Sequence, residues 1–381
     1  MYANTHLNIG IIGFGFIGKL HANAYHNIPY CFQKPTVQAR IQAVLRSRPK
    51  EDLDFIQTLG IEKVTSNHQE FYQMPIDVVD ICTPNFLHLE QVIEALNHKK
   101  HVYCEKPLGK NLSEARAMVD AAKKSNLLTH TALMMRYVPA VCQMKALIDN
   151  GEIGEPYHFR AHLYHSSYLD AQRPMAWRLR KANSGGGALA DLGIHALDLL
   201  LFMLDNIDWV QCVTRTYIQQ RPSEPGSKKM ETVDVDDWAV CTLGTKNGAS
   251  GLLEVSRVSG GNSESIAIEI IGSRGTVKVD FEDPLTCYFF NTKRKQWLIG
   301  PHDFPPPAGM RSIEQLWPPA KQTLGYMLNA HLASAYDFMQ CVQKGKSSMV
   351  SFSTALAAQE LLEAAYISAD RNGVRINLPI D

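Results

Sequence analysis

A glycine-rich hexapeptide near the N-terminus constrains the fold of this chain more than any other stretch. The residues GFGFIG at 13–18 have the spacing G-x-G-x-x-G, between an apolar segment that predicts a strand and a segment from residue 16 that predicts a helix. In that context Gly13 permits a tight turn, Gly15 lets a pyrophosphate approach the backbone, and Gly18 lets helix and strand pack closely. The free N–H groups of the helix N-terminus then face the phosphates. The hexapeptide therefore predicts a dinucleotide-binding βαβ unit; the alternative is a tight turn that binds nothing.

Alternating strands and helices fill the rest of the first third of the chain. The segments after the first helix are predicted as strand 40–46, helix 50–60, strand 76–82, helix 88–99, strand 100–105, helix 112–126 and strand 127–133. Strands that alternate with helices of about 10–15 residues are typical of a parallel, doubly wound α/β sheet. Residues 27–39 lengthen the first helix-to-strand connection and contain two prolines, so they are predicted to be a surface insertion.

Beyond residue 135 the pattern changes to consecutive strands. Helices are predicted at 141–151, 195–204, 328–345 and 353–373, and strands at 156–169, 209–218, 237–245, 249–258, 264–272, 275–281 and 285–291. Strands that follow one another without helices between them indicate an antiparallel sheet. Because 381 residues exceed what a single core holds, we expect two domains, 1–135 and 136–381. The proline-rich stretch 301–310 is predicted to be a loop.

Composition and charge disfavour several classes of partner. Lys plus Arg and Asp plus Glu each number 38, and no basic stripe is present, so nucleic acid and anionic membranes are poor partners. No apolar run approaches ~20 residues, so no membrane-spanning helix is expected. The N-terminus lacks a cationic start and a cleavage site, so its apolar run is expected to be a strand. The eight cysteines are scattered without a C-x-x-C pair, which predicts free thiols and a cytoplasmic location.

The end of the second predicted strand bears on the choice of dinucleotide. In this fold that strand normally ends on an acid that bonds the ribose hydroxyls. Here Arg46, Ser47 and Arg48 stand at its end. A guanidinium can pair bidentately with a 2′-phosphate, which an acid would repel. The sequence therefore predicts NADP as the preferred cofactor; if the stretch is a solvated basic loop, NAD is the alternative.

Two further motifs follow successive predicted strands of the parallel sheet. Thr83-Pro84-Asn85 and Glu105-Lys106-Pro107 both come at strand carboxyl ends, where such sheets bind ligands. Asn85 is expected either to contact the cofactor or to cap the following helix. The ammonium of Lys106 can point at a bound alcohol or carbonyl, provided that the backbone is held still. Pro107 supplies stiffness, and its peptide bond can be cis.

An acid and a histidine are spaced for joint chemistry in the second part of the chain. Asp191 and His195 stand at i and i+4, so on a helix they share one face with Cβ atoms ~5–6 Å apart. The preceding Gly185-Gly186-Gly187 is expected to leave room for a ligand. Histidine is the side chain best suited to exchange protons near neutral pH. The pair is therefore a candidate for general acid–base catalysis.

Metal and serine-hydrolase chemistry are disfavoured. His158, His162 and His165 cluster in sequence, but on a strand His158 and His162 would lie ~13 Å apart, with His165 on the other side. No G-x-S-x-G stretch is present that would hold a serine nucleophile. We expect no metal site.

In combination these motifs resemble those of the Gfo/Idh/MocA family of oxidoreductases, named after glucose–fructose oxidoreductase and inositol dehydrogenase. The resemblance covers nearly the whole chain and rests on residues 13–18, 83–88, 104–115 and 185–200. Residues 136–154 and 177–189 look most like the branch that contains levoglucosan dehydrogenase. Arg46 departs from the family, because many relatives that use NAD have aspartate there.

The resemblance implies an N-terminal Rossmann domain at 1–135 and a substrate-binding and oligomerisation domain at 136–381 with an open, mostly antiparallel sheet. It implies a homodimer or homotetramer formed through that sheet. It also implies Lys106, Asp191 and His195 as catalytic residues. A cis peptide before Pro107, as in relatives, would fix the lysine over the nicotinamide.

The sequence thus predicts an NAD(P)-dependent oxidoreductase that transfers a hydride between nicotinamide and a secondary hydroxyl or ketone of a sugar, glycoside or cyclitol. His195 would take the hydroxyl proton, Lys106 would hold the oxygen, and Asp191 would orient the substrate or Lys106. The predicted cofactor-binding residues are Gly13, Gly15, Phe16, Ile17, Gly18, Arg46, Ser47, Arg48, Thr83, Pro84, Asn85, His88, Glu105 and Lys106. The predicted substrate contacts are Arg136, Tyr137, Tyr164, Asp170, Trp177 and Arg178.

Two alternatives remain from other classes of function. One is a non-catalytic regulator that binds NAD(P) on the same fold; such a protein has no need of the lysine and histidine that this sequence retains. The other is an enzyme that oxidises its substrate transiently and then eliminates or hydrolyses a glycosidic bond. It would recycle bound cofactor without net production of reduced nicotinamide.

Overall fold

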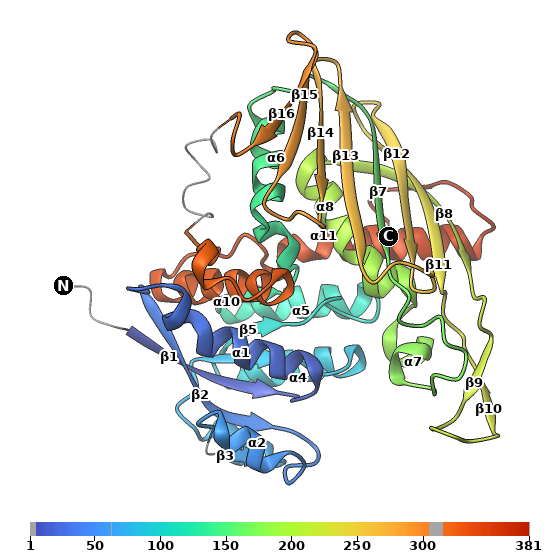
Figure 1. The fold of residues 1–381 in the computed structure, drawn as a ribbon. Helices are drawn as coiled ribbons and strands as arrows, with labels where there is room; N and C mark the ends of the chain where they lie inside the picture. The colour runs from blue at the N-terminus through green and yellow to red at the C-terminus, as the bar shows by residue number, and fades with distance from the viewer. Residues whose placement is uncertain (1–4, 62, 305–314, 381) are drawn as a thin grey trace. The chain divides into compact units, whose positions relative to one another are not determined.

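The computed structural model describes residues 5–61, 63–304 and 315–380 (Figure 1). It forms two compact units. Unit 1 comprises Met1–Gly109, Ser113–Tyr137 and Gln315–Leu356, and unit 2 comprises Lys110–Leu112, Val138–Glu314 and Ala357–Asp381. The two units therefore do not correspond to a single division of the chain after residue 135. The segment Gln315–Leu356, late in the sequence, packs in unit 1. Of the predicted loop 301–310, residues 301–304 form a turn, and the rest lies outside the described residues.

Unit 1 contains a six-stranded sheet in the order β3-β2-β1-β4-β5-β6, and each neighbouring pair is parallel. Its strands are β1 Thr5–Ile12, β2 Val37–Leu45, β3 Lys63–Thr65, β4 Val78–Ile81, β5 His101–Cys104 and β6 Thr129–Thr131. Its helices include α1 Phe16–Cys31, α2 Leu53–Thr58, α3 His68–Tyr72, α4 His88–Asn97, α5 Leu112–Ser125 and α10 Tyr326–Lys344. The parallel, doubly wound prediction is confirmed. β4 is buried at every position because helices cover both faces of such a sheet.

The predicted surface insertion at 27–39 is wrong for most of its length. α1 continues through Pro29 to Cys31, and both Ile28 and Cys31 are buried. Phe32 stacks on Tyr336 of α10 with ring centroids 4.7 Å apart, and α1 lies beside α10 in Figure 1. The apolar spacing of the helix thus persists past the proline that suggested a loop, because a helix from far along the chain covers it.

Unit 2 contains a nine-stranded sheet in the order β16-β15-β14-β13-β7-β12-β11-β8-β17. The strands are β7 Pro156–Tyr164, β8 Ile207–Arg215, β11 Trp238–Thr245, β12 Ser250–Ser256, β13 Ser265–Gly272, β14 Gly275–Asp280, β15 Cys287–Asn291, β16 Gln296–Gly300 and β17 Ile376–Asn377. Only the pair β7–β12 is parallel in this sheet, so the mostly antiparallel prediction is confirmed. A separate hairpin joins β9 Gln220–Pro222 to β10 Met230–Thr232.

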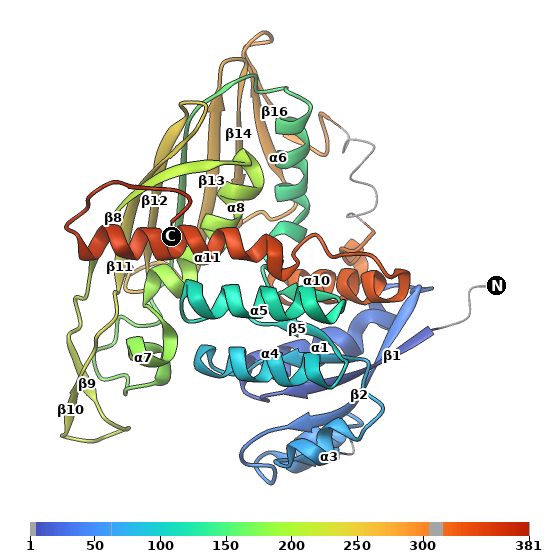
Figure 2. The same cartoon turned by 180° about the vertical axis from the view of Figure 1, so that it is seen from behind.

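Helices cover one face of this sheet. α6 Pro139–Asp149 packs on β14 and β15, and α8 Ile194–Leu204 packs on β7 and β8 (Figure 2). α11 Phe352–Asp370 joins the same side, since Ser368 accepts a hydrogen bond from the backbone of β8 at 2.9 Å. Along β7, buried and more exposed side chains alternate from Phe159 to Tyr164, as expected for a sheet with one covered face.

One helical stretch among the described residues is long and apolar enough to cross a membrane by length and composition alone. It is Lys181–Leu204, with 24 residues and a mean hydropathy of 1.7, and 72% of its apolar window is buried inside the protein. It includes α7 Lys181–Ser184 and α8. A search of the sequence for an uninterrupted apolar run does not find this stretch, because polar residues interrupt it. Its burial matches that of a core helix.

Candidate functional site

The glycine-rich turn has a different structural reason for each of its three glycines. Gly13 has φ +87°, and its N–H donates to the Leu45 carbonyl at 2.9 Å. A Cβ on Gly18 would lie 2.3 Å from the Gly13 carbonyl oxygen, so only glycine lets the helix pack here. A Cβ on Gly15 would meet no heavy atom of the described residues within 4 Å. The open space lies at the residue that precedes α1, where Phe16 is 80% exposed, as a pyrophosphate site requires.

The end of β2 holds an acid that the sequence prediction overlooked. Arg46 donates to the Glu51 carbonyl at 2.8 Å and to its carboxylate at 3.0 Å, and Arg48 lies 3.3 Å from the same carboxylate. The side chain of Arg46 is 12% exposed and that of Arg48 is 78% exposed, and Ser47 is also exposed. Arg46, Ser47 and Arg48 do follow the last residue of β2, but the loop beyond them supplies an acid at this edge. The loop folds back and places Glu51 against both guanidiniums.

A buried histidine joins the two predicted motifs at the carboxyl edge of the sheet. His88 Nε2 lies 3.0 Å from the Thr83 carbonyl oxygen, and its Nδ1 lies 3.1 and 3.2 Å from the carbonyl oxygens of Pro107 and Leu108. Burial lowers the pKa of His88. Thr83 also donates to Gln91 at 2.6 Å. His88 therefore fixes the 83–85 and 105–107 loops relative to each other.

Asn85 begins the short 3₁₀ turn that leads into α4. The residues at the N-caps of the 3₁₀ turn Asn85–Leu87 and of α4 are Pro84 and Leu87, and neither makes a side-chain cap bond. Asn85 is 7% exposed. Both expected roles of Asn85, the cofactor contact and the helix cap, stay predictions.

Lys106 lies two residues beyond the end of β5 and is half-buried. The Lys106–Pro107 peptide is cis, as in the family the motifs resemble. Glu105 is 6% exposed, and one of its carboxylate oxygens accepts the backbone N–H of Lys106 at 3.2 Å. This hydrogen bond fixes the peptide group on the N-terminal side of the lysine.

Asp191 and His195 lie in unit 2, where the helix that carries them is irregular. A π-helical turn spans Leu189–Gly193 and is followed directly by α8. Asp191 is half-buried, and His195 is 6% exposed. Single π turns occur frequently at functional sites. The two residues are therefore helical, as predicted, but not on successive turns of a regular α-helix.

The glycines that precede this helix do not leave room for a ligand. A Cβ on Gly185 would lie 2.1 Å from the Lys110 carbonyl oxygen, and one on Gly187 would lie 1.9 Å from the Asp236 carbonyl oxygen. A Cβ on Gly186 would lie 2.1 Å from the Tyr366 hydroxyl. The prediction of an open loop is wrong, because these glycines let other segments of unit 2 approach closely.

Asp236 and Tyr366 form hydrogen bonds with the backbone at the start of the helical segment that carries Asp191 and His195. Neither residue was predicted from the sequence. The Asp236 carboxylate accepts the N–H groups of Gly187 and Leu189, each at 2.8 Å, and the Tyr366 hydroxyl at 2.8 Å. Burial and the charge of Asp236 raise the pKa of Tyr366. Both residues come from strand-flanking or helical sequence without a local motif, so no signal in the chain pointed to them.

The predicted substrate contacts are dispersed. In unit 1, Arg136 and Tyr137 are 5% and 1% exposed, and Tyr137 donates to Asp337 at 2.7 Å. In unit 2, Tyr164 donates to Glu254 at 2.6 Å on the sheet face opposite α8, so the structure does not bring it together with His195.

The remaining substrate candidates lie in exposed connections of unit 2. Asp170 accepts the Gln172 N–H at 2.8 Å, and Arg178 lies over the ring of Trp177 at 4.2 Å. Of the clustered histidines, His162 lies 3.2 Å from the Ser265 hydroxyl, and His165 lies beyond the end of β7. These histidines have separate surroundings along the strand.

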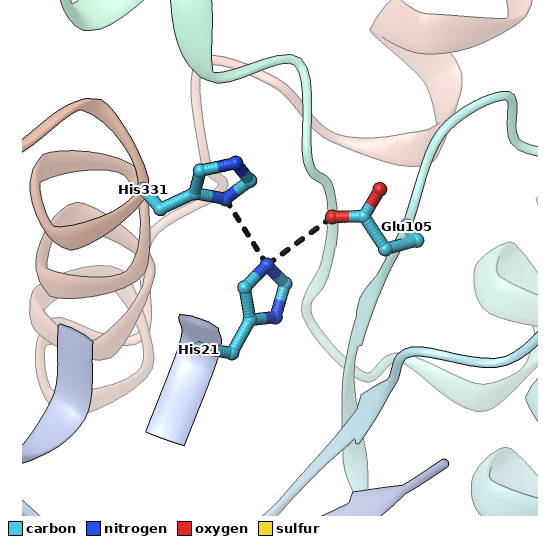
Figure 3. Close-up of side chains that lie close together, drawn as sticks. All are labelled: His21, Glu105 and His331. Carbon is cyan, nitrogen blue, oxygen red and sulfur yellow. Dashed lines mark hydrogen bonds and ion pairs between the residues drawn. The ribbon is translucent and has the colours of Figure 1, made fainter. Parts of the chain in front are cut away.

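A cluster that the sequence did not predict lies inside unit 1. His21 of α1, Glu105 and His331 of α10 place their polar atoms together in Figure 3. His21 is also within hydrogen-bond distance of Asp80 on β4. No spacing in the sequence connects these residues, because they come from four separate segments.

Comparison with known proteins places these features in a family. The description "Oxidoreductase family, NAD-binding Rossmann fold" matches residues 7–133, and "GFO/IDH/MocA C-terminal domain" matches residues 141–278. Levoglucosan dehydrogenase of Pseudarthrobacter phenanthrenivorans is 32% identical over 94% of this chain and 96% of its own length. Myo-inositol 2-dehydrogenase of Thermotoga maritima is 28% identical over 72% of this chain and 75% of its own length.

A solved structure agrees over the whole chain. Levoglucosan dehydrogenase in complex with NADH and levoglucosan has a TM-score of 0.88 and 31% identity, with 99% of this chain and 100% of that chain covered. The fold and the matches define an NAD-binding oxidoreductase. The chain belongs to the Gfo/Idh/MocA family, which confirms the resemblance read from its motifs.

Proposed function

We propose that this protein transfers a hydride between a nicotinamide dinucleotide and a secondary hydroxyl or ketone of a sugar, glycoside or cyclitol. The observation that carries the proposal is the pairing of an open pyrophosphate turn at Gly15 with Lys106 at the carboxyl edge of the same sheet. The relatives support the substrate class, since they are named for levoglucosan and myo-inositol and one is solved with L-sorbose.

Three side chains are assigned the chemical steps. His195 takes the hydroxyl proton as general base, and Lys106 holds the same oxygen and stabilises its developing negative charge. Asp191 orients the substrate or Lys106. The nicotinamide ring supplies the hydride acceptor when the dinucleotide is bound. His195 is buried beside the π turn, so a bound alcohol would meet it shielded from water.

We infer that the cofactor is NAD in place of the NADP predicted from Arg46, Ser47 and Arg48. Glu51 pairs with both arginines, so its carboxylate counters the charge that was to bind a 2′-phosphate. A carboxylate at this edge can also accept bonds from ribose hydroxyls. A related structure contains NADH, which agrees with this choice.

The function is tested with a panel of glycosides, free sugars and inositols, each with NAD and NADP, followed by absorbance of the reduced cofactor. Turnover with at least one member is expected. In Lys106→Ala and His195→Ala, turnover should fall by at least ~10²-fold while dinucleotide affinity stays near that of the wild type. Lys124→Ala, a matched change at an exposed lysine on α5, should keep near-wild-type turnover.

The outcomes separate the alternatives. Turnover that survives in Lys106→Ala or His195→Ala removes that residue from the mechanism. Dinucleotide binding without turnover on any substrate favours a regulator. Glycoside cleavage that needs bound cofactor but yields no net reduced cofactor favours the redox-assisted elimination or hydrolysis.

Assembly and location form part of the same proposal. We propose that the segment 1–135, completed by 315–356, binds the dinucleotide and that 136–304 holds substrate and forms the oligomer interface. The uncovered face of the unit 2 sheet exposes Leu252, Trp297 and Ile299 at 45–50%. All eight cysteines are free, which suits a reducing cytoplasm.

A further inference from the structure

Four ionisable side chains lie together in the interior of unit 1, and the proposed chemistry uses none of them directly. His21, Asp80, Glu105 and His331 are each at most 6% exposed. They come from α1, β4, the end of β5 and α10, and 310 positions separate the two histidines in sequence. Burying so many charges is costly unless they are paired with one another.

His21 is the centre of the cluster. Its Nδ1 lies 3.1 and 3.0 Å from the two carboxylate oxygens of Asp80. Its Nε2 lies 3.1 Å from Glu105 Oε1 and 3.1 Å from His331 Nδ1, as the dashed lines in Figure 3 show. Both ring nitrogens of one imidazole therefore face carboxylates.

A neutral His21 cannot satisfy these contacts. If its single proton is on Nδ1 and donates to Asp80, the Nε2 lone pair faces the Glu105 carboxylate, and two acceptors oppose each other. A proton on His331 Nδ1 would satisfy one contact and leave Glu105 against the same lone pair. The arrangement needs a cation at Nε2, either a proton or a metal ion.

The geometry favours the proton. Among the described residues two groups of three possible ligands share His21, one with Glu105 and His331 and one with Asp80 and Cys82, whereas buried structural zinc sites use four ligands around one ion. Lys106 also acts electrostatically on both Glu105 and His331, and a second positive charge nearby opposes a divalent cation. A proton requires no further ligand.

We propose that His21 is a permanent buried imidazolium, hydrogen-bonded to Asp80 on one side and to His331 on the other and ion-paired with Glu105, that positions Glu105 and thereby Lys106. Burial opposes the charge on His21, but Asp80 and Cys82 outweigh it and raise the pKa of His21. Burial would raise the pKa of Glu105, but the hydrogen bond and charge of His21 lower it to about 2. Burial and the charge of His21 lower the pKa of His331 to about 3, so that ring is neutral and accepts.

The groups around the imidazolium all contribute to this state. Tyr25 donates to Asp80 at 3.0 Å, and Cys82 donates to it at 3.3 Å. The Tyr103 ring meets the His21 ring edge-on at 5.4 Å, with its hydroxyl 2.8 Å from that of Ser334. Asp80 is thus fully bonded, and its charge is held against Nδ1.

Glu105 connects the imidazolium to the proposed catalytic lysine. One of its carboxylate oxygens contacts His21, and the other accepts the backbone N–H of Lys106. A carboxylate fixed at both ends fixes the peptide from which Lys106 projects. Because displacement of a catalytic group by about 1 Å can cost on the order of 10²-fold in rate, such positioning matters for turnover. This inference rests on the role proposed above for Lys106.

The protonation state is tested directly by NMR of protein labelled with ¹⁵N-histidine, with His21 assigned from a His21→Gln sample. We expect both ring nitrogens of His21 to carry protons from pH 6 to 9, and Glu105→Gln to make His21 titrate within that range. A neutral His21 at pH 7, or one equivalent of bound metal in the purified protein, would overturn the proposal.

The positioning role is tested with a matched pair at His331. His331→Leu removes the acceptor, whereas the amide oxygen of His331→Asn can replace Nδ1. His331→Leu should lower kcat by about 10-fold or more, with the dinucleotide dissociation constant within about 3-fold of the wild type, and should add an ionisation to the pH profile of kcat. His331→Asn should restore most of the rate.

Failure of this inference is distinguishable from failure of the proposed function. If Lys106→Ala is inactive but His331→Leu has the wild-type kcat and pH profile, the positioning role is wrong and the catalytic assignment stands. If Lys106→Ala is fully active, the catalytic assignment fails whatever state NMR finds for His21.

Discussion

Glu51 shows how one residue can decide a cofactor choice. It lies five positions beyond Arg46 and contacts that arginine and Arg48. In Glu51→Gln the negative charge is lost while the hydrogen bond from Arg46 to the backbone carbonyl of residue 51 remains, so affinity for NADP relative to NAD should rise about 10-fold. Fluorescence titration with both dinucleotides measures the ratio. Asp54→Asn, an exposed change on α2, serves as control, and an unchanged ratio in Glu51→Gln would place the adenosine ribose elsewhere.

A second prediction compares Gly15, where an added Cβ would meet open space, with Gly187, where it would meet the backbone of Asp236. Gly15→Ala adds a methyl group to open space at φ −79°, so the thermal midpoint without dinucleotide should change little while dinucleotide affinity falls at least ~10-fold. Gly187→Ala forces the same methyl to 1.9 Å from the Asp236 carbonyl oxygen, so it should lower the thermal midpoint by several degrees. Equal effects of the two changes on stability would contradict the structure.

At the scale of elements, the packing of α10 against β6 makes stability depend on pH. His130 of β6 lies 2.9 Å from the Ser334 hydroxyl of α10, and burial lowers its pKa to about 3 from an ordinary 6.5. Below pH 6.5 His130 binds a proton in the unfolded chain, whereas in the folded protein it does so only near pH 3. The free energy of unfolding therefore decreases as the pH falls across this window. His331 acts in the same direction. His21, with its raised pKa, stabilises the fold below pH 6.5 and loses that contribution as pH rises through its folded pKa.

The pH dependence of thermal stability tests the role of His130 at the contact between β6 and α10. In His130→Asn the thermal midpoint should fall less between pH 6.5 and 4.5 than in the wild type. The difference in slope should correspond to about one proton fewer bound on unfolding. The overall stability of the variant is not the readout, because losing the bonds to Ser334 and Ser348 lowers it at every pH. His158→Asn, an exposed change, should keep the wild-type slope. An unchanged slope in His130→Asn would mean that His130 binds its proton equally in the folded and unfolded states.

Elements also show which features could be predicted from the sequence. The glycine turn, β1, β4 and β5 were predictable because each is encoded by contiguous residues with a local physical reason. The partners of those residues were not, since Glu51 reaches Arg46 through a loop and His331 reaches His21 from 310 positions away. The prediction of open space at Gly185–Gly187 was wrong for the same reason. A glycine in the sequence is compatible with open space or with the close approach of another segment, and only the folded structure distinguishes the two.

At the scale of the whole molecule, the sheet of unit 2 predicts assembly. Its uncovered face holds a hollow of about 310 Å³ lined by Arg160, His162, Ala267, Ile268, Glu269, Lys278 and Asp280. Exposed apolar residues on this sheet, Leu252 and Trp297 among them, usually mark a partner surface. Light scattering at micromolar concentration should give a homodimer or homotetramer. Leu252→Lys combined with Trp297→Lys should yield smaller species, and a monomeric wild type would refute this interface.

The return of residues 315–356 to unit 1 has a consequence for synthesis on the ribosome. The segment supplies α10, whose Ser334 and Phe338 cover Tyr103 and His130 of the nucleotide-binding sheet. An N-terminal domain normally folds as soon as it emerges. Here the nascent chain must carry an uncovered apolar surface, with His21 lacking its partner His331, until α10 has been translated. Truncated products that stop before α10 would therefore be clients of chaperones and proteases, so only chains that include α10 would accumulate as folded protein.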